Sequence, residues 1–225
     1  MKSELSNPLT LNDRMAELIR QKIVHGEFTP GQRLSEAALS ESLEISRNTL
    51  REVFRLLTKE GLLKHEPNRG VFVAIPSIAS IIDIYRVRRL IECQALAQAY
   101  PRHPAKKRLR DAVEMALRCR DAGDWQGVGT ANMEFHRAIV ELADSERLNV
   151  MFAHLLAELR LAFGLLNDPE FLHMPYVEMN VNILELFEAG KLQEAAAALN
   201  EYLVHSERIV LAVYARRISD SGTAK

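Results

Sequence analysis

The chain has 225 residues, 48% hydrophobic and 26% charged, a composition that fits one large or two small folded domains and excludes a disordered or fibrous chain. Its 29 Lys and Arg residues are balanced by 30 Asp and Glu residues, so the net charge of -1 excludes a general attraction to polyanions or membrane surfaces. Apolar runs are too short to span a bilayer and the N-terminal residues lack a signal-peptide core, so we expect a cytoplasmic protein without a membrane partner.

The first 76 residues predict three short helices followed by two short strands. Each helical pattern follows a side chain that caps helices well, namely Thr10, Ser35 and Ser46. In the second helix we expect Ala38, Leu39 and Leu43 to form the buried stripe. The predicted helices cover 11–25, 36–43 and 47–60, and the predicted strands cover 62–66 and 71–73.

The rest of the chain predicts helices and contains no convincing strand pattern. Pro76 and Ser77 interrupt the preceding pattern, and we expect the domain boundary there, between residues 1–76 and 77–225. The expected helices cover about 77–100, 105–122, 124–143, 145–167, 169–189 and 191–218, with a frayed tail over 219–225. The predicted fold class is mainly α, with an N-terminal winged helix-turn-helix and a C-terminal all-helical bundle.

The second and third helices have the layout of a DNA-reading helix-turn-helix. The apolar side of the third helix consists of Leu50, Val53, Phe54 and Leu57. Its opposite side, which we expect to face solvent, carries Arg47, Asn48, Arg51 and Arg55. In the major groove Arg pairs with guanine and Asn with adenine. Between Ser46 and Arg69 the chain has six basic and three acidic side chains, a local charge of +3, although a solvated helix surface would also be rich in arginine.

Three stretches carry a family resemblance: PGQRLSE at 30–36, SRNTLREVFRLL at 46–57 and EGL at 60–62. They resemble the winged helix-turn-helix of GntR-family transcriptional regulators. The resemblance implies that Arg47, Asn48, Thr49 and Arg51 face the bases and nearby phosphates. It also implies that the tip of the wing hairpin, at Arg69 and Gly70, reaches the minor groove.

The helical remainder resembles the FCD ligand-binding domain of the FadR-type subfamily over most of residues 80–215. The resemblance rests on VRRLIE at 87–92, NMEFH at 132–136, and the segment from Ala189-Gly190 to Tyr202-Leu203. In many relatives an Asp or Asn, a His four residues later and two further His hold a divalent metal that binds a small carboxylate. Here Asn132 and His136 match the first pair, and the expected histidines fall on Asn180 and Tyr202. Amide and phenol oxygens are poor ligands for zinc or nickel, so we expect no tightly bound metal and no other cofactor.

We expect instead a polar cavity that binds a small organic acid directly through Asn132, His136, Asn180 and Tyr202. Arg88 would act as a carboxylate clamp. Two alternatives remain open. In the first, His136 is an ordinary core histidine, and Asn180 and Tyr202 are surface residues of amphipathic helices. In the second, Arg88 pairs with Glu92 on the helix surface at a spacing of four residues.

These patterns predict a transcriptional regulator whose affinity for operator DNA changes when an effector binds. Between the two signs of regulation they favour a repressor. A homodimer would present two recognition helices to an imperfect palindrome. We expect no enzymatic activity and assign no catalytic residue. The alternatives are a DNA-binding dimer that needs no ligand, and a helical metal-dependent enzyme that uses His136, the remaining place for a divalent metal.

Overall fold

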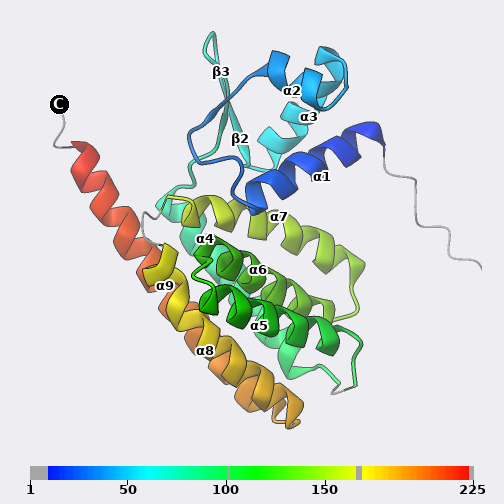
Figure 1. Cartoon of the computed structure of the whole chain (residues 1–225), viewed down its shortest axis with the longest axis vertical. Coiled ribbons are helices and arrows are strands. Elements are labelled where there is room, and N and C mark those ends of the chain that lie inside the picture. The colour runs from blue at the N-terminus through cyan, green and yellow to red at the C-terminus, as the bar shows by residue number, and fades with distance from the viewer. Residues whose placement is uncertain (1–9, 101, 166–168, 223–225) are drawn as a thin grey trace, which may run out of the picture.

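The computed structural model describes residues 10–100, 102–165 and 169–222 (Figure 1). The N-terminal part contains the predicted three helices and the predicted hairpin, and the C-terminal part is a helical bundle, which confirms the predicted fold class. The N-terminal elements are α1 (Leu11–Val24), β1 (Arg33–Leu34), α2 (Glu36–Ser42), α3 (Arg47–Lys59), β2 (Leu63–Glu66) and β3 (Gly70–Val73).

All three N-terminal helices begin at their predicted caps. The Thr10 hydroxyl accepts a hydrogen bond from the Asp13 amide at 3.2 Å, and the Asp13 carboxylate accepts one from the Thr10 amide at 3.0 Å. Ser35 and Ser46 accept hydrogen bonds from backbone amides in the first turns of α2 and α3. Each cap satisfies amide groups that the helix itself leaves without acceptors, which fixes where the helix starts.

The small sheet has the strand order β1-β3-β2, with both pairs antiparallel. The sequence predicted only the hairpin of β2 and β3, and each observed strand differs from its prediction by one residue. Strand β1 was missed because two residues are too few to display an alternating pattern. The expected stripe of α2 is partly wrong, because Ala38 is exposed, Leu39 and Leu43 are half-buried, and Ser40 is the buried residue.

The core of the N-terminal part includes side chains from the bundle. As predicted, α3 buries its apolar side, formed by Leu50, Val53, Phe54 and Leu57. These side chains share one cluster with Ile19 and Ile23 of α1, and with Ala157 and Leu161 of α7 (Glu146–Phe163). Helix α1 lies across α7 in Figure 1. The two parts of the chain therefore meet through a continuous apolar contact.

The bundle is built from the predicted helices. They are α4 (Ile78–Ala97), α5 (Ala105–Asp121), α6 (Trp125–Glu141), α7, α8 (Pro169–Glu188) and α9 (Leu192–Gly222). Helix α9 packs along α4 and α8, and α6 packs against α5 and α8, so polar side chains of α4, α6, α8 and α9 can meet inside the bundle (Figure 1).

Two details of the helices differ from expectation or limit it. Helix α9 continues to Gly222, so the expected end near residue 218 is wrong, and residues 223–225 lie outside the described part. Across the described ranges, no helix combines the length and apolar character needed to span a membrane.

Candidate functional site

The exposed side of α3 carries the predicted DNA-contacting residues. Burial of its apolar side leaves Arg47, Asn48, Arg51 and Arg55 exposed, as the spacing predicted. Thr49 is half-buried and its hydroxyl lies 2.9 Å from that of Ser46, so it takes part in the helix cap. The turn before α3 places Glu44 in the left-handed region, with φ of 53°. Four polar side chains thus project from a helix whose start and orientation are fixed.

Arg51 has a partner that the sequence did not reveal. Its Nε donates to the Glu36 carboxylate at 3.0 Å, from α3 to the first residue of α2. Arg55 forms an ion pair with Glu52 one turn earlier on its own helix. Both arginine side chains remain more than half exposed, so these surface pairs orient them without removing them from solvent.

The hairpin places Arg69 at its tip but not Gly70. Asn68 takes the left-handed conformation in the turn, and Arg69 is exposed and forms an ion pair with Glu66 at 2.5 Å. Gly70 is the first residue of β3, is half-buried and pairs with Glu66, which corrects its expected place at the tip. Its φ of 107° explains the glycine, because side-chain-bearing residues rarely adopt this conformation.

The predicted ligand residues come together in a buried polar cluster inside the bundle. Asn132 of α6 accepts two hydrogen bonds through Oδ1, from Asn180 Nδ2 at 2.7 Å and from the Tyr202 hydroxyl at 3.1 Å. The rings of His136 and Tyr202 have their centroids 4.9 Å apart. Helices α6, α8 and α9 therefore bring Asn132, His136, Asn180 and Tyr202 together, as the resemblance to the FCD domain implied.

Glu92 joins this cluster, and sequence reasoning did not assign it to the site. One carboxylate oxygen accepts from Arg88 Nε at 2.6 Å, and the other lies 2.5 Å from His136 Nδ1. The three side chains are at most 1% exposed, so the Arg88–Glu92 pair is buried and the alternative of a surface pair is wrong. The spacing of four residues on α4 was the available signal, but it did not reveal which side of the helix faces inward.

The cluster leaves polar atoms without partners. Among the described residues, no hydrogen-bond partner is present for Arg88 Nη2, His136 Nε2 or Asn180 Oδ1, and all three atoms are buried. Buried polar atoms are nearly always paired with protein groups, water or a ligand. The arrangement could therefore bind a small molecule with both donor and acceptor atoms.

The donor set does not fit a transition metal. Asn132 Oδ1 is already occupied by two hydrogen bonds, and His136 Nδ1 faces Glu92. Zinc and nickel prefer imidazole or thiolate ligands over amide and phenol oxygens. The part of the chain that the structure describes holds no group of three His, Cys, Asp or Glu side chains placed to bind a metal ion. We assign no step to a metal at this position.

The protonation of His136 predicts a pH dependence of stability. Burial lowers the pKa of the His136 imidazole below 6.5, the Glu92 carboxylate opposes this effect, and the Arg88 charge adds to it. A base with a lowered pKa in the folded state contributes stability above about pH 6.5, and this contribution is lost as the pH falls towards the lower value. We expect the free energy of unfolding to decrease from pH 7.5 to 5.5, more steeply than in a His136→Gln variant.

Urea unfolding at a series of pH values measures this slope. The largest difference that one histidine can contribute is about 1.4 kcal/mol per pH unit. His65→Gln, which removes an exposed histidine of β2, is the matched control for the substitution itself. Equal slopes in wild type and His136→Gln would contradict the neutral, buried state of this ring.

Comparison with known proteins places both parts of the chain. A model for bacterial regulatory proteins of the gntR family matches residues 11–73, and the FCD domain model matches residues 83–205. A solved transcriptional regulator GntR from Rhodococcus sp. RHA1 is similar, with a TM-score of 0.84 and 36% identity, over 89% of this chain and 97% of that chain. The solved McbR/YncC of E. coli has a TM-score of 0.79 at 21% identity, over 92% of this chain and 100% of that chain, a likeness of fold.

Curated relatives match over shorter segments. The HTH-type transcriptional regulator YdhC of Bacillus subtilis is 27% identical over 60% of this chain and 62% of its own length. The HTH-type transcriptional repressor RspR of Escherichia coli is 31% identical over 44% of this chain and 43% of its own length. The galactonate operon transcriptional repressor of Escherichia coli is 45% identical over 29% of this chain and 30% of its own length. The chain thus spans less than two thirds of the length of these relatives.

Proposed function

The chain belongs to the gntR family of bacterial regulatory proteins and carries an FCD domain. We propose that it is a dimeric repressor whose affinity for operator DNA is controlled by a small organic acid. A DNA-binding transcriptional regulator is what both domains and the similar proteins have in common. Dimerisation, repression, a cytoplasmic location and the effector are our proposals. Repressor names among the relatives support the sign of regulation.

One observation carries the DNA-binding proposal. The capped helix α3 buries its apolar side and exposes Arg47, Asn48, Arg51 and Arg55 on the other. A helix of this kind in the major groove reads bases through its first two turns. We assign Arg47, Asn48, Thr49 and Arg51 to bases and nearby phosphates. Arg55, Arg69 and the backbone at Gly70 are assigned to backbone or minor-groove contacts.

The buried polar cluster supports the effector proposal. Its unpaired atoms, Arg88 Nη2, His136 Nε2 and Asn180 Oδ1, include donors suited to carboxylate oxygens and an acceptor suited to a hydroxyl group. We propose that a small hydroxy acid binds there, with Asn132 and Tyr202 holding the neighbouring polar groups. The His136–Glu92 pair resembles an acid-base pair of enzymes, but both domain models and the relatives named above are regulatory, so we propose a binding role for it.

Selection from random duplexes tests the proposed function. The purified protein should enrich a short imperfect palindrome, because two α3 helices related by a two-fold axis read equivalent half-sites. Sequencing after several rounds of gel-shift selection measures the enrichment. Enrichment of no sequence, or of a single site without two-fold symmetry, would contradict DNA recognition by a symmetric dimer.

A further inference from the structure

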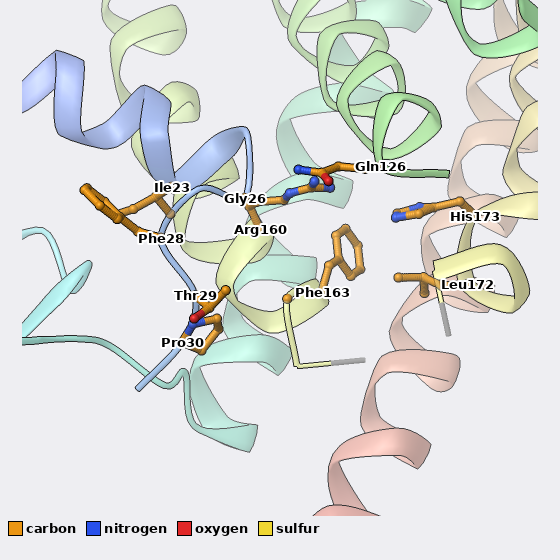
Figure 2. A pocket seen from close by; sticks show the side chains of 11 residues that line it. Ile23, Gly26, Phe28, Thr29, Pro30, Gln126, Arg160, Phe163, Leu172 and His173 are labelled. Atoms are coloured by element: carbon orange, nitrogen blue, oxygen red, sulfur yellow. The ribbon is translucent and has the colours of Figure 1, made fainter. Parts of the chain in front are cut away.

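A cavity lies where the N-terminal part meets the bundle (Figure 2), and none of its lining residues belongs to the polar cluster. Its volume is about 210 Å³. One side is formed by the end of α1 and the following loop, and the other by the ends of α6, α7 and α8. The residues that matter here are Ile23, Phe28, Pro30, Arg160, Phe163 and His173.

Arg160 brings an uncompensated positive charge to this cavity. The residue is 8% exposed, and burial lowers the pKa of its guanidinium. Within the described ranges Arg160 has no hydrogen-bond acceptor and forms no ion pair with a carboxylate, whereas the buried Arg88 forms both with Glu92. A buried cation without a partner is costly, so the position favours an anion.

His173 adds a second nitrogen donor beside Arg160. The side chain is 3% exposed, and its Nδ1 has no hydrogen-bond partner among the described residues. Burial, reinforced by the Arg160 charge, lowers the pKa of His173 to about 3, so the ring is neutral at pH 7. A neutral imidazole still donates one hydrogen bond, and a nearby anion would favour the tautomer whose N–H faces the anion.

The two side chains lie against the same residue of α6. A Cβ placed on Gly129 of α6 would lie 2.6 Å from Arg160 Nη1 and 2.7 Å from His173 Nε2. Both nitrogen atoms therefore pack closely against the backbone of Gly129, and a side chain at this position would force one of them to move. In Figure 2 the His173 ring points towards the Arg160 guanidinium, and the Phe163 ring lies beside them.

We propose that this cavity is a second effector site, which binds a monocarboxylate whose apolar body is about the size of a benzene ring. The carboxylate would accept hydrogen bonds from Arg160 and His173, and the body would pack on Ile23, Phe28 and Phe163. The size follows from the volume, because apolar cavities of about 150 Å³ hold benzene. The site shares no lining residue with the cluster around Asn132, so it stands whether or not that cluster binds an effector.

Its position couples the ligand to DNA binding. The cavity wall comes from both parts of the chain, and Gln126 at its edge already joins them, donating from Nε2 to the His25 carbonyl at 2.5 Å. A ligand between them binds more tightly to the arrangement in which both walls are in place. If DNA binding also favours one arrangement, the two binding events are coupled. The ligand then changes the affinity for DNA by the same factor by which DNA changes the affinity for the ligand.

Benzoate is the probe, and benzamide is its neutral counterpart of the same shape. We expect benzoate to bind the full-length protein in calorimetry and to raise its melting temperature, and benzamide to do neither. Arg160→Met should lower the affinity for benzoate roughly 10- to 100-fold, since hydrogen bonds to a charged group are lost. Arg147→Met, at an exposed position of the same helix, should leave benzoate binding unchanged.

Gly129→Ala provides a second variant, because its methyl group would lie within 3 Å of Arg160 Nη1 and His173 Nε2, displace these side chains and weaken benzoate binding. Circular dichroism establishes that each variant is folded. Absence of benzoate binding by the wild-type protein would overturn the proposal. Equal binding of benzamide, or benzoate binding that survives Arg160→Met, would overturn it too.

Discussion

Replacing Arg51 with alanine is expected to remove the preference of the protein for its operator over unrelated duplex. Arg51 is exposed on α3, and Glu36 directs its guanidinium along the surface that we assign to the major groove. A bidentate contact between Arg and guanine contributes about 1–3 kcal/mol of discrimination. A symmetric dimer makes the contact in both half-sites, so the loss should reach roughly 30- to 20,000-fold in specificity. Competition gel shifts with operator and scrambled duplexes measure it.

Arg69→Ala is the contrasting variant for this experiment. Arg69 lies at the tip of the hairpin, more than half exposed, where a phosphate is the expected partner. Its loss should weaken binding to operator and scrambled duplex alike, and lower the slope of log affinity against log salt by about 1 for each contact removed. If Arg51→Ala instead keeps the full operator preference, α3 is not the recognition helix.

Replacing Glu92 with glutamine is expected to cause a large loss of stability. The substitution leaves Arg88 buried without a counter-charge and removes the carboxylate beside His136. Breaking a buried ion pair by removing one partner costs about 3–5 kcal/mol. For a chain of this size the melting temperature should fall by roughly 6–20 °C. Urea unfolding and calorimetry at pH 7.5 measure the change.

Glu52→Gln is the matched control, because it removes the carboxylate of the exposed Glu52–Arg55 pair on α3. Surface pairs contribute about 0–1 kcal/mol, so this variant should melt close to wild type. The double variant Arg88→Met/Glu92→Met removes both charges and should recover part of the loss, since no unpaired charge remains. A Glu92→Gln variant as stable as Glu52→Gln would mean that the Arg88–Glu92 pair is open to solvent.

The N-terminal fold was predictable because its signals are local. Capping side chains and the apolar side of α3 lie within a few residues of what they determine, and the Ser46 cap marks the start of α3. Strand β1 was not predictable, because its two residues are held by β3 about 40 positions later. The Arg51–Glu36 contact also joins separate helices, which no periodicity reveals.

In the bundle, the helices were predictable and the inward side of α4 was not. Apolar residues occur around most of α4: Ile81 and Tyr85 are fully buried, whereas Leu90 is 75% exposed. With no clear apolar side, Glu92 could not be assigned to the interior. Arg160 and His173 belong to different helices, and only the packing of α7, α6 and α8 brings them to Gly129.

The apolar contact between α1 and α7 limits how the regulator can be taken apart. A fragment that stops at the linker after β3 would lose Ala157 and Leu161 from its interior and leave Ile19 and Ile23 open to water. Truncation of the chain at Pro76 is therefore not expected to give a stable isolated N-terminal domain. A signal that changes DNA binding therefore either moves the N-terminal part along the apolar α1–α7 contact as one body, or separates the two helices and exposes apolar surface to water.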